Sequence, residues 1–381
     1  MPTQRPPARP PLIGILAAAL ALLAVAVGTA LGIVANRAPD EAVESVDLFG
    51  AGTPSPSAPG TTAPPPGSDL KGPLNILIAG HDMVEGVSFR GIPHSDAVLI
   101  LHVDSTLTHA YLTSLPRDLL VPIPANPASG TPAHSSDKLT HAMTYGARVP
   151  GSNRQDLAQG FALTARTVSA YTGIEHFDAG AVLSFEGLTR LVDVLGGIDL
   201  YVDHKVTSHH LGPDGKNAEA TGGPYMVYEV GMQHLNGWQA LDYARQRYGL
   251  PNGAYDRDRH HRQMVKALVT KLVDFEIPRY PLMASFYAQY VRAINLAFTV
   301  DLRGRPLSQW VYALRNLKPE AITIVGLPGG GVSSGGAYLG ERLQPIADDY
   351  FEAMQDDTVA EFLAAHPELT ADQDPTTVPQ S

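Results

Sequence analysis

The chain has 381 residues, a formal net charge of −11 and no cysteine. Its length allows one large domain or two small ones, and a hydrophobic content of 44% is ample for a packed core. The lack of cysteine excludes a disulfide framework, a thiolate nucleophile and a zinc site built from cysteine. The acidic balance argues against nucleic-acid binding.

An uncharged apolar run follows Pro11 and reads LIGILAAALALLAVAVGTALGIVA. At about 1.5 Å per residue, its roughly 24 residues can cross a hydrocarbon core about 30 Å thick, so we expect a transmembrane helix over residues 11–36. Arg5 and Arg9 precede the run and acidic residues follow it, which predicts a cytoplasmic segment 1–10 and an extracytoplasmic body on a single-pass protein of the cell membrane. The alternative is a cleaved signal peptide, although its apolar run is usually only about 7 to 15 residues long.

Residues 37–72 are predicted to be an extended spacer, because their second half is rich in Pro, Ser, Thr and Gly and has almost no large apolar side chain. No internal repeat or second linker of this kind follows, so residues 73–364 are predicted to form one domain. Residues 365–381 are rich in Pro, Thr and Asp and are expected to be disordered. The spacer would hold the domain away from the membrane.

Within this body, short apolar runs bounded by turn residues predict strands, two of which are joined by the turn Asp104-Ser105-Thr106 into an antiparallel hairpin. The predicted strands cover residues 75–79, 97–103, 110–114, 179–183, 198–202 and 321–327. Helical periodicity, with glycine at several helix ends, predicts helices over residues 154–171, 185–195, 256–275, 282–297 and 341–364. Helices that flank a mixed central sheet define an α/β fold of the α-β-α sandwich type.

The stretch LDYARQRYGLPNGAYDRDRHHRQM, residues 241–264, gathers five arginines in an acidic chain. Arg245 and Arg247 are two residues apart, so they share a face only in extended backbone, and the helix before them should end beside them if both serve one site. The alternative for the next helix is a solvated face that pairs with Asp256 and Asp258. That helix places polar side chains on one face, opposite an apolar face, at Arg259, Arg262, Gln263 and Lys266.

A second set of charged residues stands at the ends of predicted strands. Asp82 follows the run NILIAGH, Asp96 precedes the strand of HSDAVLILHVD, and Arg117 and Asp118 follow the strand in SLPRD. The ends of strands are where the sites of α/β sheets tend to be built. Each of these residues alone can also be read as a turn or cap residue.

Together these segments resemble the LytR-CpsA-Psr family of extracytoplasmic proteins. The resemblance also rests on DKLTHAMTYG at 137–146, FEGLTRLVDVLGGIDLYV at 185–202, and HLNGWQALDYARQR followed by DRDRHHRQ. It covers roughly residues 74–273 in collinear order. It implies the α-β-α sandwich and the transfer of a glycopolymer, such as wall teichoic acid, capsular polysaccharide or arabinogalactan, from a polyprenyl-pyrophosphate carrier to peptidoglycan.

The resemblance also assigns roles to residues. Asp82 and Asp96 would hold Mg²⁺ or Mn²⁺, while Asp256 and Asp118 would orient the catalytic arginines, with Asp118 also a candidate base. His94 stands where the family usually has Arg, a change that weakens one phosphate contact unless Arg90 compensates. The pyrophosphate would be surrounded by Arg117, Lys138, Arg245, Arg247, Arg259 and Gln263.

These residue types suit the chemistry. Arginine donates in pairs to phosphate and stays charged, and Mg²⁺ binds through one or two carboxylates plus phosphate oxygens. We expect a peptidoglycan hydroxyl, by resemblance the 6-OH of N-acetylmuramic acid, to attack the sugar-proximal phosphorus, which leaves a phosphodiester link and releases polyprenyl phosphate. Two alternatives use the same site: a lipid pyrophosphatase with water as the acceptor, and a non-enzymatic module that binds polyprenyl phosphate or anionic glycan.

The lipid tail needs an apolar groove. The helix over residues 156–171 is a candidate for one wall of it, unless its apolar side chains are ordinary core. These side chains are Leu157, Phe161, Leu163 and Val168.

Two further signals are weaker. Residues 331–335 fit the G-x-S-x-G pattern of a nucleophile elbow, but His366 is the only histidine downstream for a triad, so a serine hydrolase is not expected. The pairs His209-His210 and His260-His261 lack the usual spacing of metal ligands, so we expect solvated or locally bonded side chains.

Overall fold

The computed structural model describes residues 45–50, 69–81, 93–246, 249–251, 254–274, 293, 295 and 297–370. The predicted transmembrane run, most of the spacer and the last 11 residues lie outside these ranges, as does almost all of the helix predicted over 282–297. Among the described residues, no helix is both long enough and apolar enough to cross a membrane.

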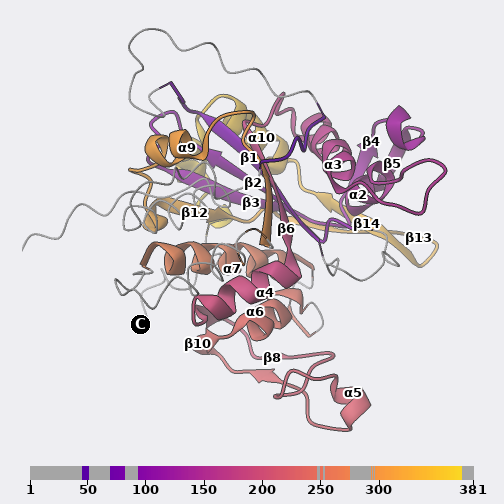
Figure 1. Cartoon of the computed structure of the whole chain (residues 1–381), viewed down its shortest axis with the longest axis vertical. Coiled ribbons are helices and arrows are strands. Elements are labelled where there is room, and N and C mark those ends of the chain that lie inside the picture. Colours follow the sequence, from indigo (N-terminus) through magenta and orange to yellow (C-terminus); the bar gives the residue numbers. More distant parts are fainter. Residues whose placement is uncertain are drawn as a thin grey trace, which may run out of the picture.

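A six-stranded mixed sheet forms the centre of the body (Figure 1). The hairpin predicted around the Asp104 turn is confirmed, since the second and third strands pair antiparallel. The first strand pairs antiparallel with the second and parallel with β6, and the third pairs parallel with β12. In spatial order the strands are β11 (Phe298–Asp301), β6 (Ala179–Ser184), β1 (Leu74–His81), β2 (Ala97–Val103), β3 (Ala110–Leu115) and β12 (Ile322–Val325).

The strands are apolar throughout because both faces of the sheet are covered. Successive side chains of a strand point to opposite faces, and β2 follows this rule: Leu99 and Leu101 belong to one buried cluster, whereas Val98 and Ile100 belong to another. The two clusters are the cores above and below the sheet.

Helices cover each face, which gives the three layers of an α-β-α sandwich as predicted. The layer that carries the site consists of α4 (Phe185–Val194), α6 (Gly237–Arg245), α7 (Ala254–Asp274) and α9 (Leu307–Ala313). Figure 1 shows α4, α6 and α7 stacked next to one another on that side. The opposite layer consists of α2 (Thr140–Gly146), α3 (Leu157–Thr172), α10 (Ile346–Gln355) and α11 (Val359–Ala365).

Small ribbons extend from this core, and most of them have no strong signal in the sequence. The strand predicted at 198–202 exists, but it pairs in one of these ribbons and not in the central sheet. The ribbons are β4 (Leu120–Ile123) with β5 (His134–Lys138), β7 (Ile198–Val202) with β10 (Gly231–Leu235), β8 (Val206–Thr207) with β9 (Val227–Tyr228), and β13 (Gly329–Ser334) with β14 (Ala337–Leu343). The short helix α5 (Ala218–Thr221) lies with β8 and β9 at the end of an arm (Figure 1).

The helix predicted over 341–364 is wrong in its first part. Its first residues belong to β14, which ends at Leu343, and the chain turns at Pro345 before α10 begins. The remaining helix is broken between α10 and α11, where Asp357 adopts a left-handed backbone conformation with φ of 55°. A helix cannot continue through such a residue.

Candidate functional site

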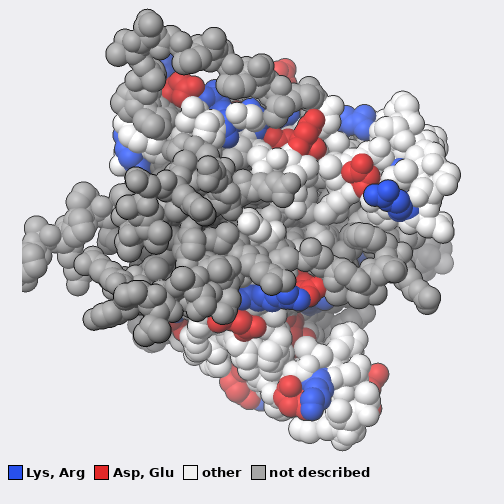
Figure 2. All heavy atoms as spheres, viewed as in Figure 1, with Lys and Arg blue, Asp and Glu red and all other residues white. Residues whose placement is uncertain are grey.

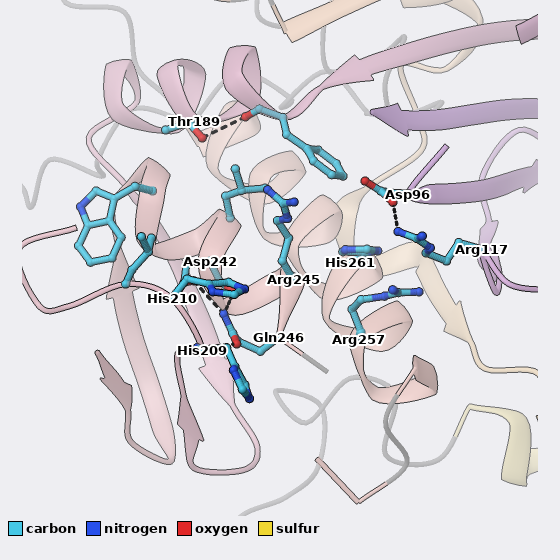
Figure 3. A pocket seen from close by; sticks show the side chains of 14 residues that line it. Asp96, Arg117, Thr189, His209, His210, Asp242, Arg245, Gln246, Arg257 and His261 are labelled. Carbon is cyan, nitrogen blue, oxygen red and sulfur yellow. Dashed lines mark hydrogen bonds and ion pairs between the residues drawn. The ribbon is translucent and has the colours of Figure 1, made fainter. Parts of the chain in front are cut away.

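A pocket of about 630 Å³ opens beside the ends of β2 and β3, where α4, α6 and α7 meet (Figure 3). Figure 3 shows Thr189 and His210 toward one end of it, Arg117 and Asp96 at the other, and Arg245 in between. The wall is cationic and polar at Asp96, Arg117, Asp242, Arg245, Gln246, Arg257 and His261, and the apolar part of the lining is Phe185, Leu211, Trp238 and Leu241.

The hairpin of β2 and β3 sets one end of the pocket. Val98 pairs with Leu115, so continuing the antiparallel register brings Asp96 opposite Arg117, and the Asp96 carboxylate accepts a hydrogen bond from Nη1 of Arg117. The backbone N–H of Asp96 donates to the carbonyl oxygen of Gly80 at 2.8 Å, which ties the residue just before β2 to the end of β1. Backbone register therefore places the first arginine.

Asp118 extends this group away from the pocket. Its Oδ1 lies 3.6 Å from Nε of Arg117 and 3.4 Å from Nζ of Lys138. Lys138 reaches it because β5 pairs with β4, with Lys138 opposite Leu120. The buried Asp118 thus holds two cations predicted for the site next to each other.

The end of α6 supplies the second arginine. The helix begins with a capping box in which Asn236 and Gln239 satisfy each other's backbone N–H groups. It ends at Arg245, and Gln246 is extended with ψ of 135°, as the spacing of the arginines predicts. The Arg245 guanidinium lies 5.8 Å from the ring centroid of Phe185, on the pocket wall.

Helix α7 supplies the third arginine, and its first two turns are buried. Arg257 and His261 are four residues apart, share one face of the helix and line the pocket. Arg257 also pairs with Asp258, whose Oδ1 is 3.1 Å from Nη2. The alternative of a solvated face that pairs with Asp256 and Asp258 is wrong as to solvation, because Arg259, Arg262 and Gln263 are buried, but Arg259 does pair with Asp256.

Arg259 itself is engaged in ion pairs. Its Nη1 lies 2.8 Å from Oδ1 of Asp256, and its Nη2 contacts the carboxylate of Asp203. Both Arg259 and Asp256 line a second pocket of about 390 Å³ on another face of α7, together with Arg262, whose guanidinium donates to Ser114. The ion pairs tie α7 to the segment after β7.

Burial and charge shift several groups around α7. Burial acts to raise the pKa of Asp203, but the hydrogen bond from His260 and the charge of Arg259 bring it well below the usual value. Burial lowers the pKa of His260 and His261 below 6.5, so both rings are neutral at pH 7, and it lowers the pKa of Arg262 to about 10. Arg262 therefore stays charged at neutral pH, while His261, which lines the pocket, is neutral.

On the molecular face in Figure 2, basic side chains lie beside acidic ones and form no large basic surface. The gathering of Arg117, Arg245 and Arg257 around one pocket therefore stands out from the surface composition. A pocket with three guanidinium groups and an apolar wall suits an anionic ligand that also has an apolar part.

Comparisons with known proteins agree with this architecture. The LytR_cpsA_psr family model matches residues 41–356. The chain belongs to the LytR_cpsA_psr family. The resemblance seen in its motifs is thereby confirmed.

Among curated relatives of this LytR_cpsA_psr protein, the polyisoprenyl-teichoic acid–peptidoglycan teichoic acid transferase TagU of Enterococcus faecalis is 28% identical over 235 residues, which is 61% of this chain and 62% of the relative. Biofilm regulatory protein A of Streptococcus mutans is 30% identical over 207 residues, which is 53% of this chain and 44% of that protein. The chain therefore spans less than two thirds of the length of these relatives.

Solved structures share the fold. A protein from Streptococcus agalactiae superposes with a TM-score of 0.57 at 20% identity and covers 75% of this chain and 87% of that one. TagV of B. subtilis gives 0.52 at 19% identity, with 76% and 98% covered, and TagT bound to LI-WTA gives 0.52 at 21%, with 75% and 90% covered. At these identities the likeness shows the fold alone.

In this LytR_cpsA_psr protein, the structure brings together part of the predicted site. Asp96, Arg117 and Arg245 line the pocket, with Asp118 and Lys138 directly behind Arg117. Arg259 and Asp256 line the second pocket instead. His94 lies 3.0 Å from the Thr144 hydroxyl, and Gln263 is buried; neither lines the first pocket. Asp82, Arg90 and Arg247 lie outside the described residues.

Sequence reasoning missed Arg257 and His261. Their i, i+4 spacing in DRDRHHRQ was a usable signal, because it puts both on one helix face. The expectation that His260 and His261 are solvated or locally bonded is wrong as to solvation, because both are buried. His260 is bonded instead: its Nε2 lies 3.4 Å from Oδ1 of Asp203, and its ring packs on Tyr243 with ring centroids 4.3 Å apart.

The predicted lipid groove on α3 is wrong. Phe161, Leu163 and Val168 are fully buried in the core on the opposite side of the sheet from the pocket. They are therefore ordinary core. The apolar lining that does adjoin the arginines comes from α4, α6 and the arm.

The G-x-S-x-G pattern and the pair His209-His210 can also be compared with the structure. Ser333 lies in β13 and pairs across a hairpin with Tyr338, so residues 331–335 form no strand–turn–helix elbow. Within the described ranges, no three His, Asp or Glu side chains come together as a set of metal ligands. His209 and His210 line the end of the pocket away from Arg117 (Figure 3), which is its outer part.

Proposed function

We propose that this protein transfers a glycopolymer from a polyprenyl-pyrophosphate carrier to peptidoglycan and releases polyprenyl phosphate. The observation that carries the proposal is the single pocket in which Arg117, Arg245 and Arg257 face an apolar wall. Support also comes from relatives named polyisoprenyl-teichoic acid–peptidoglycan teichoic acid transferase TagU and from a fold shared with TagT bound to LI-WTA. A membrane helix over residues 11–36 and an extracytoplasmic body would bring the pocket to a lipid carrier.

The ligand's two phosphoryl groups suit the cationic end. Each guanidinium offers paired N–H donors that match phosphate oxygens and stays charged at any physiological pH. Asp96 and Asp118 orient Arg117, and Asp258 orients Arg257, so these guanidinium groups are positioned before the ligand arrives. The hydrocarbon next to the pyrophosphate would lie along Phe185 and Leu241 and their apolar neighbours.

The transfer is a substitution at phosphorus. The acceptor hydroxyl oxygen forms a bond to the sugar-proximal phosphorus as that phosphorus loses its bond to the bridging oxygen. The bridging oxygen leaves with its electron pair on polyprenyl phosphate, and the acceptor proton passes to a base, for which Asp118 is the candidate. The arginines stabilise the charge on the equatorial and leaving oxygens, where phosphoryl transfer is most sensitive.

The pocket offers the carboxylate of Asp96 as a ligand for a divalent cation. The Asp96 carboxylate is a hard oxygen donor beside the arginines, and Mg²⁺ needs only one or two carboxylates plus phosphate oxygens. Asp96 would hold Mg²⁺, or Mn²⁺, together with Asp82. When bound, the ion would neutralise charge on the pyrophosphate.

Two substitutions test the proposal. We expect Arg117→Ala to lower the rate of polyprenyl phosphate release by about 10²- to 10³-fold, because one preorganised donor is lost from the phosphoryl site. Asp96→Ala should also abolish turnover with the fold intact, as judged by circular dichroism. The matched control is Arg166→Ala, which removes an exposed arginine on α3 and should leave the rate unchanged. Near-normal rates of polyprenyl phosphate release in both Arg117→Ala and Asp96→Ala would contradict the proposal.

A further inference from the structure

The hairpin of β13 and β14 presents an aromatic ring next to the proposed site. The side chain of Tyr338 is 46% exposed, one of the largest exposures of any large hydrophobic residue in the described part of the chain. The ring atoms Cε2 and Cδ2 come within 3.4 and 3.7 Å of where a Cβ of Gly331 would be. Ser333, also exposed, is paired with Tyr338 across the hairpin.

The ring is held rigidly although it is exposed. The Tyr338 hydroxyl donates to Oε1 of Glu341 at 2.6 Å, and the hydroxyl of Tyr255 donates to Oε2 of the same carboxylate at 3.2 Å. Glu341 is buried, so this anchor is shielded from water. A rigid aromatic surface binds a partner at a low cost in conformational entropy.

The hairpin is also fixed to the loop that carries Arg117. The backbone N–H of Glu341 donates to the carbonyl oxygen of Asp118 at 2.8 Å. Gly340 allows this approach, since a Cβ there would lie 2.5 Å from the same oxygen. The ring therefore keeps a set position relative to Arg117.

A chain of contacts links the ring to the cationic pocket. Nζ of Lys138 lies 4.8 Å from the centroid of the Tyr338 ring and 3.4 Å from Oδ1 of Asp118, which in turn is 3.6 Å from Nε of Arg117. Arg117 stands at the far end of the pocket from Thr189 and His210 (Figure 3). The Tyr338 ring is therefore next to the Arg117 end of the pocket, opposite its outer part.

We propose that Tyr338 is the platform for the acceptor glycan, on which a hexose ring of the peptidoglycan strand stacks with its apolar face. This inference rests on the proposed function. The neutral ring suits a neutral sugar, the Ser333 hydroxyl and the Lys138 ammonium can hydrogen-bond to the sugar's hydroxyl and N-acetyl carbonyl oxygens, and the partner class is an N-acetylated hexose polymer. Aromatic side chains with a polar handle are suited to such half-apolar, half-polar partners.

The position agrees with the geometry of the transfer. The attacking and leaving oxygens of a phosphoryl transfer lie roughly in line. With the lipid along the wall formed by Phe185 and Leu241, the leaving oxygen points toward the outer part of the pocket, and the acceptor approaches from the side of Arg117 and Lys138. Tyr338 is on that side.

Binding of each substrate is measured separately with the 381-residue chain. The acceptor probe is a fluorescent peptidoglycan glycan oligomer without lipid, and the donor probe is a fluorescent polyprenyl pyrophosphate. We expect Tyr338→Ala to raise the Kd of the oligomer about five- to tenfold, the loss of one aromatic stacking contact, and to leave the Kd of the lipid within about twofold. Tyr338→Phe keeps the ring and should bind the oligomer within about twofold of the parent chain.

The matched control is Tyr225→Ala, which removes a tyrosine of similar exposure, 38%, on the arm. It should leave the oligomer's Kd unchanged. An unchanged oligomer Kd in Tyr338→Ala, or an equal weakening of oligomer and lipid, would overturn the platform. Failure of the parent chain to bind the lipid would instead refute the proposed function, and the oligomer measurement would still decide whether Tyr338 binds glycan.

Discussion

Two arginines on α7, only two residues apart, are expected to respond to substitution in opposite ways. Arg259 pairs with Asp256 and Asp203, and Asp256 is 1% exposed. Arg257 lines the pocket and also pairs with Asp258. The structure therefore predicts a mainly structural role for Arg259 and a ligand-binding role for Arg257.

Removal of Arg259 leaves buried carboxylates without their main counter-charge. Breaking a buried ion pair costs about 3–5 kcal/mol, and the lower end applies here because Asp203 also contacts His260. We expect Arg259→Ala to lower the free energy of unfolding by about 3 kcal/mol, a large part of the roughly 5–15 kcal/mol of a typical domain. Arg257→Lys keeps the charge next to Asp258 and should cost less than about 1 kcal/mol, but the ammonium cannot donate in a planar pair to phosphate.

Urea unfolding gives the stability of each variant, and titration with fluorescent polyprenyl pyrophosphate gives its affinity. We expect Arg257→Lys to be nearly as stable as the parent chain and to bind the lipid about tenfold more weakly, a loss of about 1.4 kcal/mol. The reasoning would be refuted if Arg259→Ala kept its stability within about 1 kcal/mol and lost lipid binding, because Arg259 would then contact the ligand.

Two further predictions concern pH and the core. Burial lowers the pKa of His102, His260 and His261, so each of these histidines is more protonated in the unfolded chain than in the folded one as the pH falls below 6.5. The free energy of unfolding should therefore fall by up to about 1.4 kcal/mol per pH unit for each histidine, and equal urea midpoints at pH 7.5 and 5.5 would contradict this. Phe161→Ala should lower the free energy of unfolding by about 3–5 kcal/mol through a core cavity and leave the lipid affinity of the folded chain unchanged. Trp238→Ala should weaken lipid binding at near-normal stability. Weaker lipid binding in Phe161→Ala and unchanged binding in Trp238→Ala would instead support a lipid groove on α3.

Much of the fold could be predicted from the sequence because local signals and packing agree there. The strands β1, β2 and β3 are continuous apolar runs, and a strand buried on both faces requires such a run. The end of α6 at Arg245 followed from the need to place two nearby arginines on one site. In these segments the local sequence pattern and the tertiary structure require the same secondary structure.

The sequence was less informative where tertiary contacts decide. The segment around Glu341 has helical spacing but pairs with β13, because the Glu341 backbone bonds to Asp118 and its side chain bonds to Tyr255, both distant in sequence. Arg257 and Arg259 look equivalent in DRDRHHRQ, and only the positions of the pocket and Asp203 separate them. Phe161 has the same apolar character in a core as in a lipid groove.

The central claim is tested most directly with the 381-residue chain, Mg²⁺ and a polyprenyl-pyrophosphate sugar labelled on the sugar. Release of polyprenyl phosphate is followed with and without peptidoglycan oligomer. We predict that release depends on the oligomer and that the label appears on it. If release has the same rate with and without the oligomer and the label does not appear on the oligomer, water is the acceptor and the transferase is contradicted. If the lipid binds tightly but no polyprenyl phosphate is released, the protein is a binding module.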